Sequence, residues 1–160
     1  MNLVNKFVFV TALYDINRKD RKFEFYINNL KKLLKFKVPL IIFCNSETHN
    51  KLKKIKRKYF TKFIIKEFHE LYFFKNHYTQ IKEILESKKF VENVKDYGAR
   101  IETTSAEYNI VNYSKFFFLE NAKELLHSDY YIWVDAGIPR FFKKIPKDIW
   151  PDFSKFKNKI

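Results

Sequence analysis

The sequence predicts an α/β fold with a Rossmann-like, mostly parallel sheet, and two observations support this. Apolar runs typical of buried strands occur at residues 3–12, 38–44 and 130–134. Segments in which apolar residues recur at helical spacing lie between these runs, and such alternation is typical of βαβ units. No repeat, low-complexity tract or linker divides the chain, so residues 1–160 are expected to form one domain or part of one.

The first half of the chain is predicted to contain three strands and two helices. A strand over residues 3–12 leads into a polar loop, and a helix with one buried face follows over residues 21–36. The second strand, residues 38–44, has a proline at its start, where proline is tolerated. A basic helix over residues 51–60 precedes a short third strand at residues 62–66.

The second half is predicted to begin with a helix over residues 77–90 whose inward face carries Ile81, Ile84 and Leu85. A polar loop from residue 93 to residue 104 contains Gly98. The last helix, residues 106–126, leads directly into the strand at residues 130–134.

One lysine interrupts the apolar stripe of this last helix. At roughly 100° per residue, six apolar or small residues lie within about 60° of the direction of Lys115. They are Tyr108, Val111, Phe118, Leu119, Ala122 and Leu126. An unpaired buried ammonium is costly, so either the lysine stem lies in the core with its head at the edge, or the charge has a partner. In the second case Lys115 emerges in a crevice beside Asp135.

The segment YYIWVDAGIPR at residues 130–140 places a carboxylate where a buried strand ends. The strand is expected to be covered on both faces, and parallel strands deliver their last residues into the ligand crevice of an open α/β sheet. Ala136 and Gly137 leave room for a ligand or metal beside Asp135. The alternative is that Asp135 only begins a turn.

The basic composition has two interpretations. The net charge of +14 is compatible with nucleic-acid binding, and the cluster KLKKIKRKYF at residues 51–60 is its densest region. However, only five of the 32 basic residues are arginine, and the cluster is also typical of a solvated helix face. A basic surface also favours phosphate ligands or an anionic membrane surface.

Several common functional classes lack their sequence signals. The chain has no apolar run of about 20 residues and no signal-peptide pattern, so we expect a cytoplasmic protein. With Cys44 as the single cysteine, an intrachain disulfide is impossible, and the four histidines lack zinc-ligand spacing. Two glycines cannot form a Rossmann or Walker phosphate loop, and no Gly-x-Ser-x-Gly elbow occurs.

Three segments together resemble a known family. They are FVTALYDINR at residues 9–18, SAEYNIVNYSKFFFLENA at residues 105–122 and YYIWVDAGIPRF at residues 130–141. The arrangement is similar to the HtrL/YibB family, also described as WlaTC/HtrL-type glycosyltransferases. The resemblance implies a fold of the GT-A type that binds a nucleotide-sugar donor, usually with Mn²⁺ or Mg²⁺, and transfers the sugar to a glycan or other hydroxyl acceptor.

By resemblance, the loop after the first strand contacts the nucleotide of the donor. Thr11 lies at its start, Tyr14 would stack on a base, Asp15 would accept a hydrogen bond from base or ribose, and Arg18 would pair with the diphosphate.

The catalytic residues implied by resemblance are Asp135 and Lys115. Asp135 would ligate the divalent metal, and Lys115 would face the diphosphate. Gly137 belongs to the same donor site. It stands where an Asp-x-Asp motif has its second carboxylate, so a cationic side chain would take over part of the role of the metal. Glu102 and Glu107 are the candidate bases.

The resemblance also suggests an incomplete enzyme, because the sequence ends at residue 160, soon after Asp135. The expected fragment lacks the C-terminal part that binds the acceptor. Two alternatives to an active enzyme stay open. One is an inactive glycosyltransferase relic, and the other is a non-catalytic nucleic-acid-binding module that uses Lys53, Lys54 and Arg57.

Overall fold

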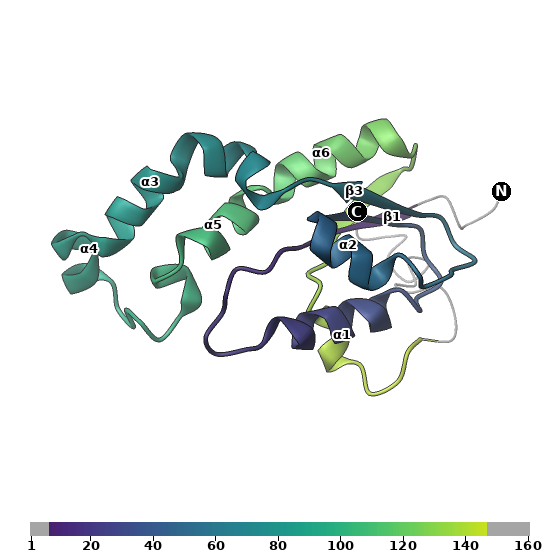
Figure 1. Ribbon diagram of the computed structural model, residues 1–160, viewed down its shortest axis with the longest axis horizontal. Helices are drawn as coiled ribbons and strands as arrows, with labels where there is room; N and C mark the ends of the chain where they lie inside the picture. Colours follow the sequence, from purple (N-terminus) through teal and green to yellow (C-terminus); the bar gives the residue numbers. More distant parts are fainter. Residues whose placement is uncertain (1–6, 147–160) are drawn as a thin grey trace, which may run out of the picture.

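The computed structural model describes residues 7–146, which form a four-stranded parallel sheet with helices on both faces (Figure 1). The strands are β1 (Phe7–Leu13), β2 (Leu40–Cys44), β3 (Thr61–Ile65) and β4 (Tyr130–Trp133). Their order in the sheet is β3-β2-β1-β4, and all three pairings are parallel. The predicted α/β class and parallel sheet are therefore confirmed.

The strand order reverses between β1 and β4. The chain moves from β1 to β2 to β3 in one direction and then returns to place β4 on the other side of β1. Val10 pairs with Ile41 on one side and with Trp133 on the other, so β1 lies at the centre of the register. In open parallel sheets, the crevice at such a reversal, outside the carboxyl ends of the strands, is the usual ligand site.

Side chains of β1 alternate between two buried clusters. Phe7, Phe9 and Leu13 pack on the face covered by α1 (Phe23–Leu33) and α2 (Ser46–Leu52). Val8 and Val10 pack on the opposite face, with residues of α5 (Ala106–Tyr113) and α6 (Lys115–Leu125). Because all seven residues of β1 are buried, this strand fixes the positions of the loops at its end.

The helical region α3 (Tyr72–Glu86), α4 (Lys88–Asn93) and α5 extends away from the sheet (Figure 1). The predicted helix over residues 77–90 is wrong in its limits, because α3 begins five residues earlier and ends at Glu86. Ser87 starts a new helix, since its hydroxyl accepts a hydrogen bond from the Phe90 amide. Leu85 is buried as predicted, but Ile84 is half exposed.

The helix predicted over residues 106–126 is divided into α5 and α6 at Ser114. The Ser114 hydroxyl donates a hydrogen bond of 2.8 Å to the Ile110 carbonyl, and such bonds compete with the helical ladder. Lys115 is therefore the first residue of α6 rather than the middle of one long helix.

Two further expectations about surface segments are corrected. β4 is an edge strand of the described sheet and only half-buried, so the expected cover on both faces is wrong. The basic helix predicted over residues 51–60 ends at Leu52, and residues 53–60 have no helical structure.

The third strand is confirmed over Thr61–Ile65, and α1 is confirmed over a shorter range than predicted. The start of the first predicted strand and the segment after residue 146, on which the expectation of an incomplete enzyme rests, lie outside the described residues. Three short 3-10 helices, η2 (Phe68–Glu70), η3 (Ile101–Thr103) and η4 (Ile138–Phe141), complete the described fold. Over residues 7–146, no helix has the length and apolar character that a membrane span requires.

Candidate functional site

A cavity of about 340 Å³ opens at the carboxyl ends of β1 and β4, where the strand order reverses. This volume lies in the range of small-molecule sites, which is about 300–1,000 Å³. Its walls come from the loop after β1, the start of α1, helices α5 and α6, and the turn after β4. The three segments of the family resemblance therefore meet at one site.

Positive side chains dominate the polar lining of this cavity. Four cations, Arg18, Arg21, Lys115 and Arg140, line it together with only two carboxylates, Asp15 and Asp135. Three of the five arginines of the chain are in this set, but only one of the many lysines is. Arginine binds phosphate oxygens in a bidentate manner, so the cavity suits a phosphorylated ligand.

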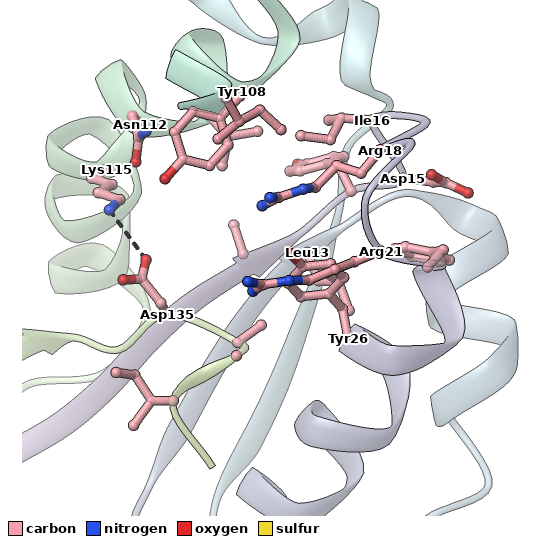
Figure 2. A pocket seen from close by; sticks show the side chains of 18 of the residues that line it. Leu13, Asp15, Ile16, Arg18, Arg21, Tyr26, Tyr108, Asn112, Lys115 and Asp135 are labelled. Atoms are coloured by element: carbon pink, nitrogen blue, oxygen red, sulfur yellow. Dashed lines mark ion pairs between the residues drawn. The ribbon is translucent and has the colours of Figure 1, made fainter. Parts of the chain in front are cut away.

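Arg18 projects from the loop after β1 into the cavity, and Figure 2 shows its guanidinium near Tyr108. Its Nε and Nη2 donate to the two carboxylate oxygens of Asp20, at 2.8 and 2.6 Å, and this pairing raises the pKa of Arg18 above its ordinary value. The guanidinium also lies 5.7 Å from the centroid of the Tyr26 ring and 5.8 Å from that of Tyr108. These contacts hold the charge in place and lower the entropy cost of binding an anion.

Lys115 has a partner, as one of the two sequence interpretations predicted. Its Nζ lies 3.1 Å from Asp135 Oδ1 (Figure 2). The Trp133 indole N–H donates to the same oxygen at 2.8 Å. The lysine side chain is 28% exposed and the aspartate 59%, so the pair lies at the surface of the cavity rather than in the core. Trp133 thus fixes the carboxylate, and the carboxylate fixes the ammonium.

The turn after β4 brings Arg140 back over Gly137. The Arg140 amide donates to the Gly137 carbonyl at 3.2 Å, which closes the 3-10 helix η4. A Cβ atom at position 137 would lie only 2.8 Å from the guanidinium Nη1 of Arg140. Gly137 has an ordinary φ of −83°, so its lack of a side chain serves the close approach of this arginine rather than the backbone.

Two of the residues assigned to nucleotide contact by resemblance are placed differently. Thr11 lies inside β1, fully buried, and does not line the cavity. Tyr14 lines the cavity but is only 5% exposed, because its ring packs against Phe68 and Phe118. This burial does not favour the expected stacking of Tyr14 on a base, which stays an untested prediction. Burial also raises the pKa of the Tyr14 hydroxyl far above its ordinary value.

Asp15 lines the rim, and Figure 2 shows its carboxylate pointing away from the cavity. One oxygen accepts from the Asn17 amide at 2.9 Å, and Asn17 has a positive φ of 52°. Such a turn is typical of aspartate and asparagine. Asp15 thus shapes the loop that carries Arg18, and its expected hydrogen bond to a base or ribose is not prepared by this geometry.

The residue-level assignments from the sequence did not include Arg21, Tyr26, Tyr108 or Arg140, all of which line the cavity. Figure 2 shows the Arg21 side chain directed into the cavity from the loop that precedes α1. Tyr26 also carries a buried hydroxyl without a hydrogen-bond partner among residues 7–146. The scarcity of arginine was a usable signal, because most of the arginines gather here.

Neither candidate base lines the cavity. Glu107 accepts hydrogen bonds from Tyr78 at 2.6 Å and from Ser105 at 3.0 Å, and these bonds outweigh its partial burial and lower its pKa. It therefore links α3 to α5. Glu102 is exposed and pairs weakly with Arg100 at 3.9 Å. The structure supports neither of them as a base at this site.

The basic segment after α2 has a structural arginine at its centre. Arg57 donates to the carbonyls of Phe36 and Val38 at 2.7 and 2.8 Å and to Thr61 Oγ1 at 2.6 Å. Its burial lowers the pKa of the guanidinium to about 10. Arg57 is therefore not available to nucleic acid, although Lys53 and Lys54 are exposed.

The donor set around Asp135 does not fit a divalent metal held by the protein. Among the described residues, no group of three histidine, cysteine, aspartate or glutamate side chains comes together. Asp135 Oδ1 is already paired with the Lys115 ammonium and accepts a hydrogen bond from the Trp133 indole. A Mg²⁺ or Mn²⁺ ion would need several further oxygen ligands. The expected metal on Asp135 stays an untested prediction that this geometry does not favour.

The fold and the cavity together define a parallel α/β protein with a cationic ligand site at the strand-order reversal. Residues 5–152 match the model of a family described as "Bacterial protein of unknown function (HtrL_YibB)". The chain belongs to this HtrL_YibB family. Searches of curated proteins and of solved structures gave no match.

Proposed function

We propose that this protein is a glycosyltransferase, or its donor-binding portion, with a fold of the GT-A type, and that the cavity holds a nucleoside-diphosphate sugar. The observation that carries the proposal is the convergence of Arg18, Arg21, Arg140 and Lys115 at the strand-order reversal. A diphosphate is the part of the donor that matches this charge. The nucleotide-sugar class itself comes from the family resemblance rather than from the cavity.

In this proposal the arginines bind the diphosphate and Tyr108 or Tyr26 supplies the aromatic contact for the base. Both tyrosines line the cavity on either side of Arg18, whereas Tyr14 is buried. Lys115 faces the bond between the sugar and the diphosphate, which breaks when the sugar is transferred. Cations placed at the departing diphosphate stabilise its developing negative charge, and this is the main contribution that such a site makes to sugar transfer.

Asp135 has a positioning role in this scheme. It holds the Lys115 ammonium at 3.1 Å and is itself oriented by the Trp133 indole. Replacement of Asp135 by asparagine keeps the shape and removes the charge, so the ammonium loses its partner. The general base and the acceptor site are not assigned to any described residue, and a cytoplasmic location is part of the proposal.

The test is a calorimetric titration of UDP, GDP and their common sugars in the presence of Mn²⁺. We expect a nucleoside diphosphate to bind, with UMP or GMP at least tenfold weaker, because one phosphate engages fewer cations. Arg18→Gln should weaken the binding of the diphosphate about tenfold or more, since a hydrogen bond to a charged group contributes about 1.5–3 kcal/mol.

Lys53→Gln is the matched control for this titration. It removes the same positive charge from an exposed residue outside the cavity, so the affinity should stay within about twofold of the wild type. The proposed function would be contradicted if no nucleoside diphosphate bound to the folded protein, or if both variants lost affinity equally.

A further inference from the structure

The turn after β4 carries an arginine in the space that a second carboxylate of an Asp-x-Asp motif would fill. Position 137 follows Asp135 by two residues, and a Cβ atom there would lie 2.8 Å from Arg140 Nη1, so the guanidinium occupies this space and would have to move to admit a side chain. We infer that Arg140 and Lys115 take the place of the divalent cation, so that this cavity binds its diphosphate ligand without a metal. The inference rests on the proposed function and specifies its cofactor requirement.

The charges at Asp135 support this inference. A metal-binding aspartate needs oxygen ligands around the ion, whereas the nearest charged group to Asp135 Oδ1 is the Lys115 ammonium at 3.1 Å. Asp15, the other carboxylate of the cavity lining, is directed away from the cavity (Figure 2). A divalent cation at this site would meet positive side chains on several sides and one carboxylate that is already shared.

Arg140 is held in a defined position. The η4 turn fixes its backbone through the bond to the Gly137 carbonyl, and its guanidinium lies 4.4 Å from the centroid of the Phe141 ring. Tyr26 lies beside the same turn, because its ring is 3.7 Å from the position of a Cβ at residue 137. No carboxylate is recorded as an ion-pair partner of Arg140 among the described residues, so its donors can serve an anion.

The chemistry of arginine explains how it can replace a metal here. A divalent cation in such a site neutralises the diphosphate and orients it, and a planar guanidinium does both through two parallel hydrogen bonds to phosphate oxygens. Lys115, in α6, adds a second cation to the cavity lining, and Asp135 at 3.1 Å offsets part of its charge. Together the two side chains supply the positive charge that a divalent ion would bring.

The experiment is a calorimetric titration of UDP, GDP and inorganic pyrophosphate into the full-length protein, in EDTA and in Mn²⁺. Pyrophosphate reports on the charge of the site independently of the base. We expect the affinity of the best nucleoside diphosphate to differ by less than about threefold between EDTA and Mn²⁺, because arginine rather than metal carries the contact.

Two variants connect this result to Arg140. In EDTA, Arg140→Gln should lose tenfold or more in affinity for the diphosphate, and Arg140→Lys should lose less because it keeps the charge without the fork. Arg100→Gln is the matched control, since Arg100 is exposed and outside the cavity lining. Its affinity should equal that of the wild type. Thermal unfolding of each variant shows that it is folded.

The outcomes separate the two proposals. Binding of UDP or GDP only when Mn²⁺ is present would overturn the metal-free inference and leave the proposed function intact. An unchanged affinity of both folded Arg140 variants in EDTA would also overturn it. Binding of pyrophosphate in EDTA with no preference for a nucleoside diphosphate would support the arginine site and count against the glycosyltransferase proposal.

Discussion

The cavity at the ends of β1 and β4 and the segment from Lys51 to Lys58 are both rich in positive charge, but they use it in opposite ways. In the cavity, four cations from three different segments, the loop after β1, α6 and η4, line one space. In the segment, Arg57 is directed inward to backbone carbonyls, while Lys53 and Lys54 point to solvent. A high local density of lysine is therefore not a site by itself. Convergence of side chains from distant parts of the chain is what separates the two regions.

The contrast has a chemical basis. A guanidinium has five donors in a fixed plane, so it can bind either an anion or a set of carbonyl oxygens. Arg57 uses its donors within the protein, whereas Arg140 keeps its donors at the cavity surface. Four predictions, in order of decreasing effect, test whether the two regions differ in this way.

The largest effect is expected for Arg57→Ala, which removes a structural contact and no ligand contact. It leaves the carbonyls of Phe36 and Val38 without their donor, and we expect a loss of about 3 kcal/mol in the free energy of unfolding. Urea denaturation measures this loss. Lys58→Ala, an exposed neighbour, should change stability by less than about 0.5 kcal/mol. Equal effects in both variants would contradict a structural role for Arg57.

The Lys115–Asp135 pair should contribute little to stability and much to binding. Because the pair is partly exposed, a double-mutant cycle with Lys115→Met and Asp135→Asn should give a coupling of at most about 1 kcal/mol in unfolding. Lys115→Met alone should weaken binding of a nucleoside diphosphate about tenfold or more, because it removes a charged donor to the phosphates. A coupling of several kcal/mol in unfolding, with unchanged binding, would show the pair to be structural.

The contact between α3 and α5 gives a smaller, pH-dependent effect. The bonds from Tyr78 and Ser105 lower the pKa of Glu107 below its ordinary value of 4.5. A carboxyl group with a lowered folded-state pKa stabilises the protein above pH 4.5, and this contribution is lost as the pH falls through the folded-state value. Stability should therefore fall less between pH 7 and pH 3 in Glu107→Gln than in the wild type, by up to about 1 kcal/mol. An identical decrease in both proteins would contradict the linkage.

The smallest effect is expected for the double variant Lys53→Gln, Lys54→Gln. Both lysines are exposed and neither lines the cavity, so the affinity for UDP or GDP should change by less than about twofold at physiological salt. A loss as large as that of Arg18→Gln would break the distinction between the two basic regions. Tight binding of single-stranded nucleic acid that depends on Lys53 and Lys54 would revive the binding-module alternative.

The strands, and the points where β1 and β4 end, could be predicted from the sequence. Buried parallel strands appear as apolar runs, and polar residues follow where each run ends. Helical periodicity left two interpretations of Lys115 open, and the structure agrees with the one that placed it beside Asp135. The burial of Tyr14 was not predicted, although Tyr14 continues the alternation of Val8, Val10 and Ala12, whose side chains pack with those of α6. Strand periodicity extended by one step would have predicted its burial.

Other features depend on contacts that no local pattern contains. The approach of Arg140 to Gly137 requires the η4 turn, and its sequence IPRF has no strong turn signal beyond the proline. The role of Arg57 depends on carbonyls about twenty residues earlier in the chain, so its charge alone suggested an exposed residue. The division at Ser114 reflects a competition between side-chain and backbone hydrogen bonds that periodicity does not show.

The most direct test of the central claim uses the Trp133 indole N–H, which donates to Asp135 at 2.8 Å in the wall of the cavity. Its NMR signal, assigned by its absence in Trp133→Phe, is recorded while UDP or GDP is added in EDTA. We predict a saturable shift of this signal that Arg140→Gln weakens and Arg100→Gln leaves unchanged. A signal that stays fixed while calorimetry detects nucleotide binding would place the ligand elsewhere and contradict the claim.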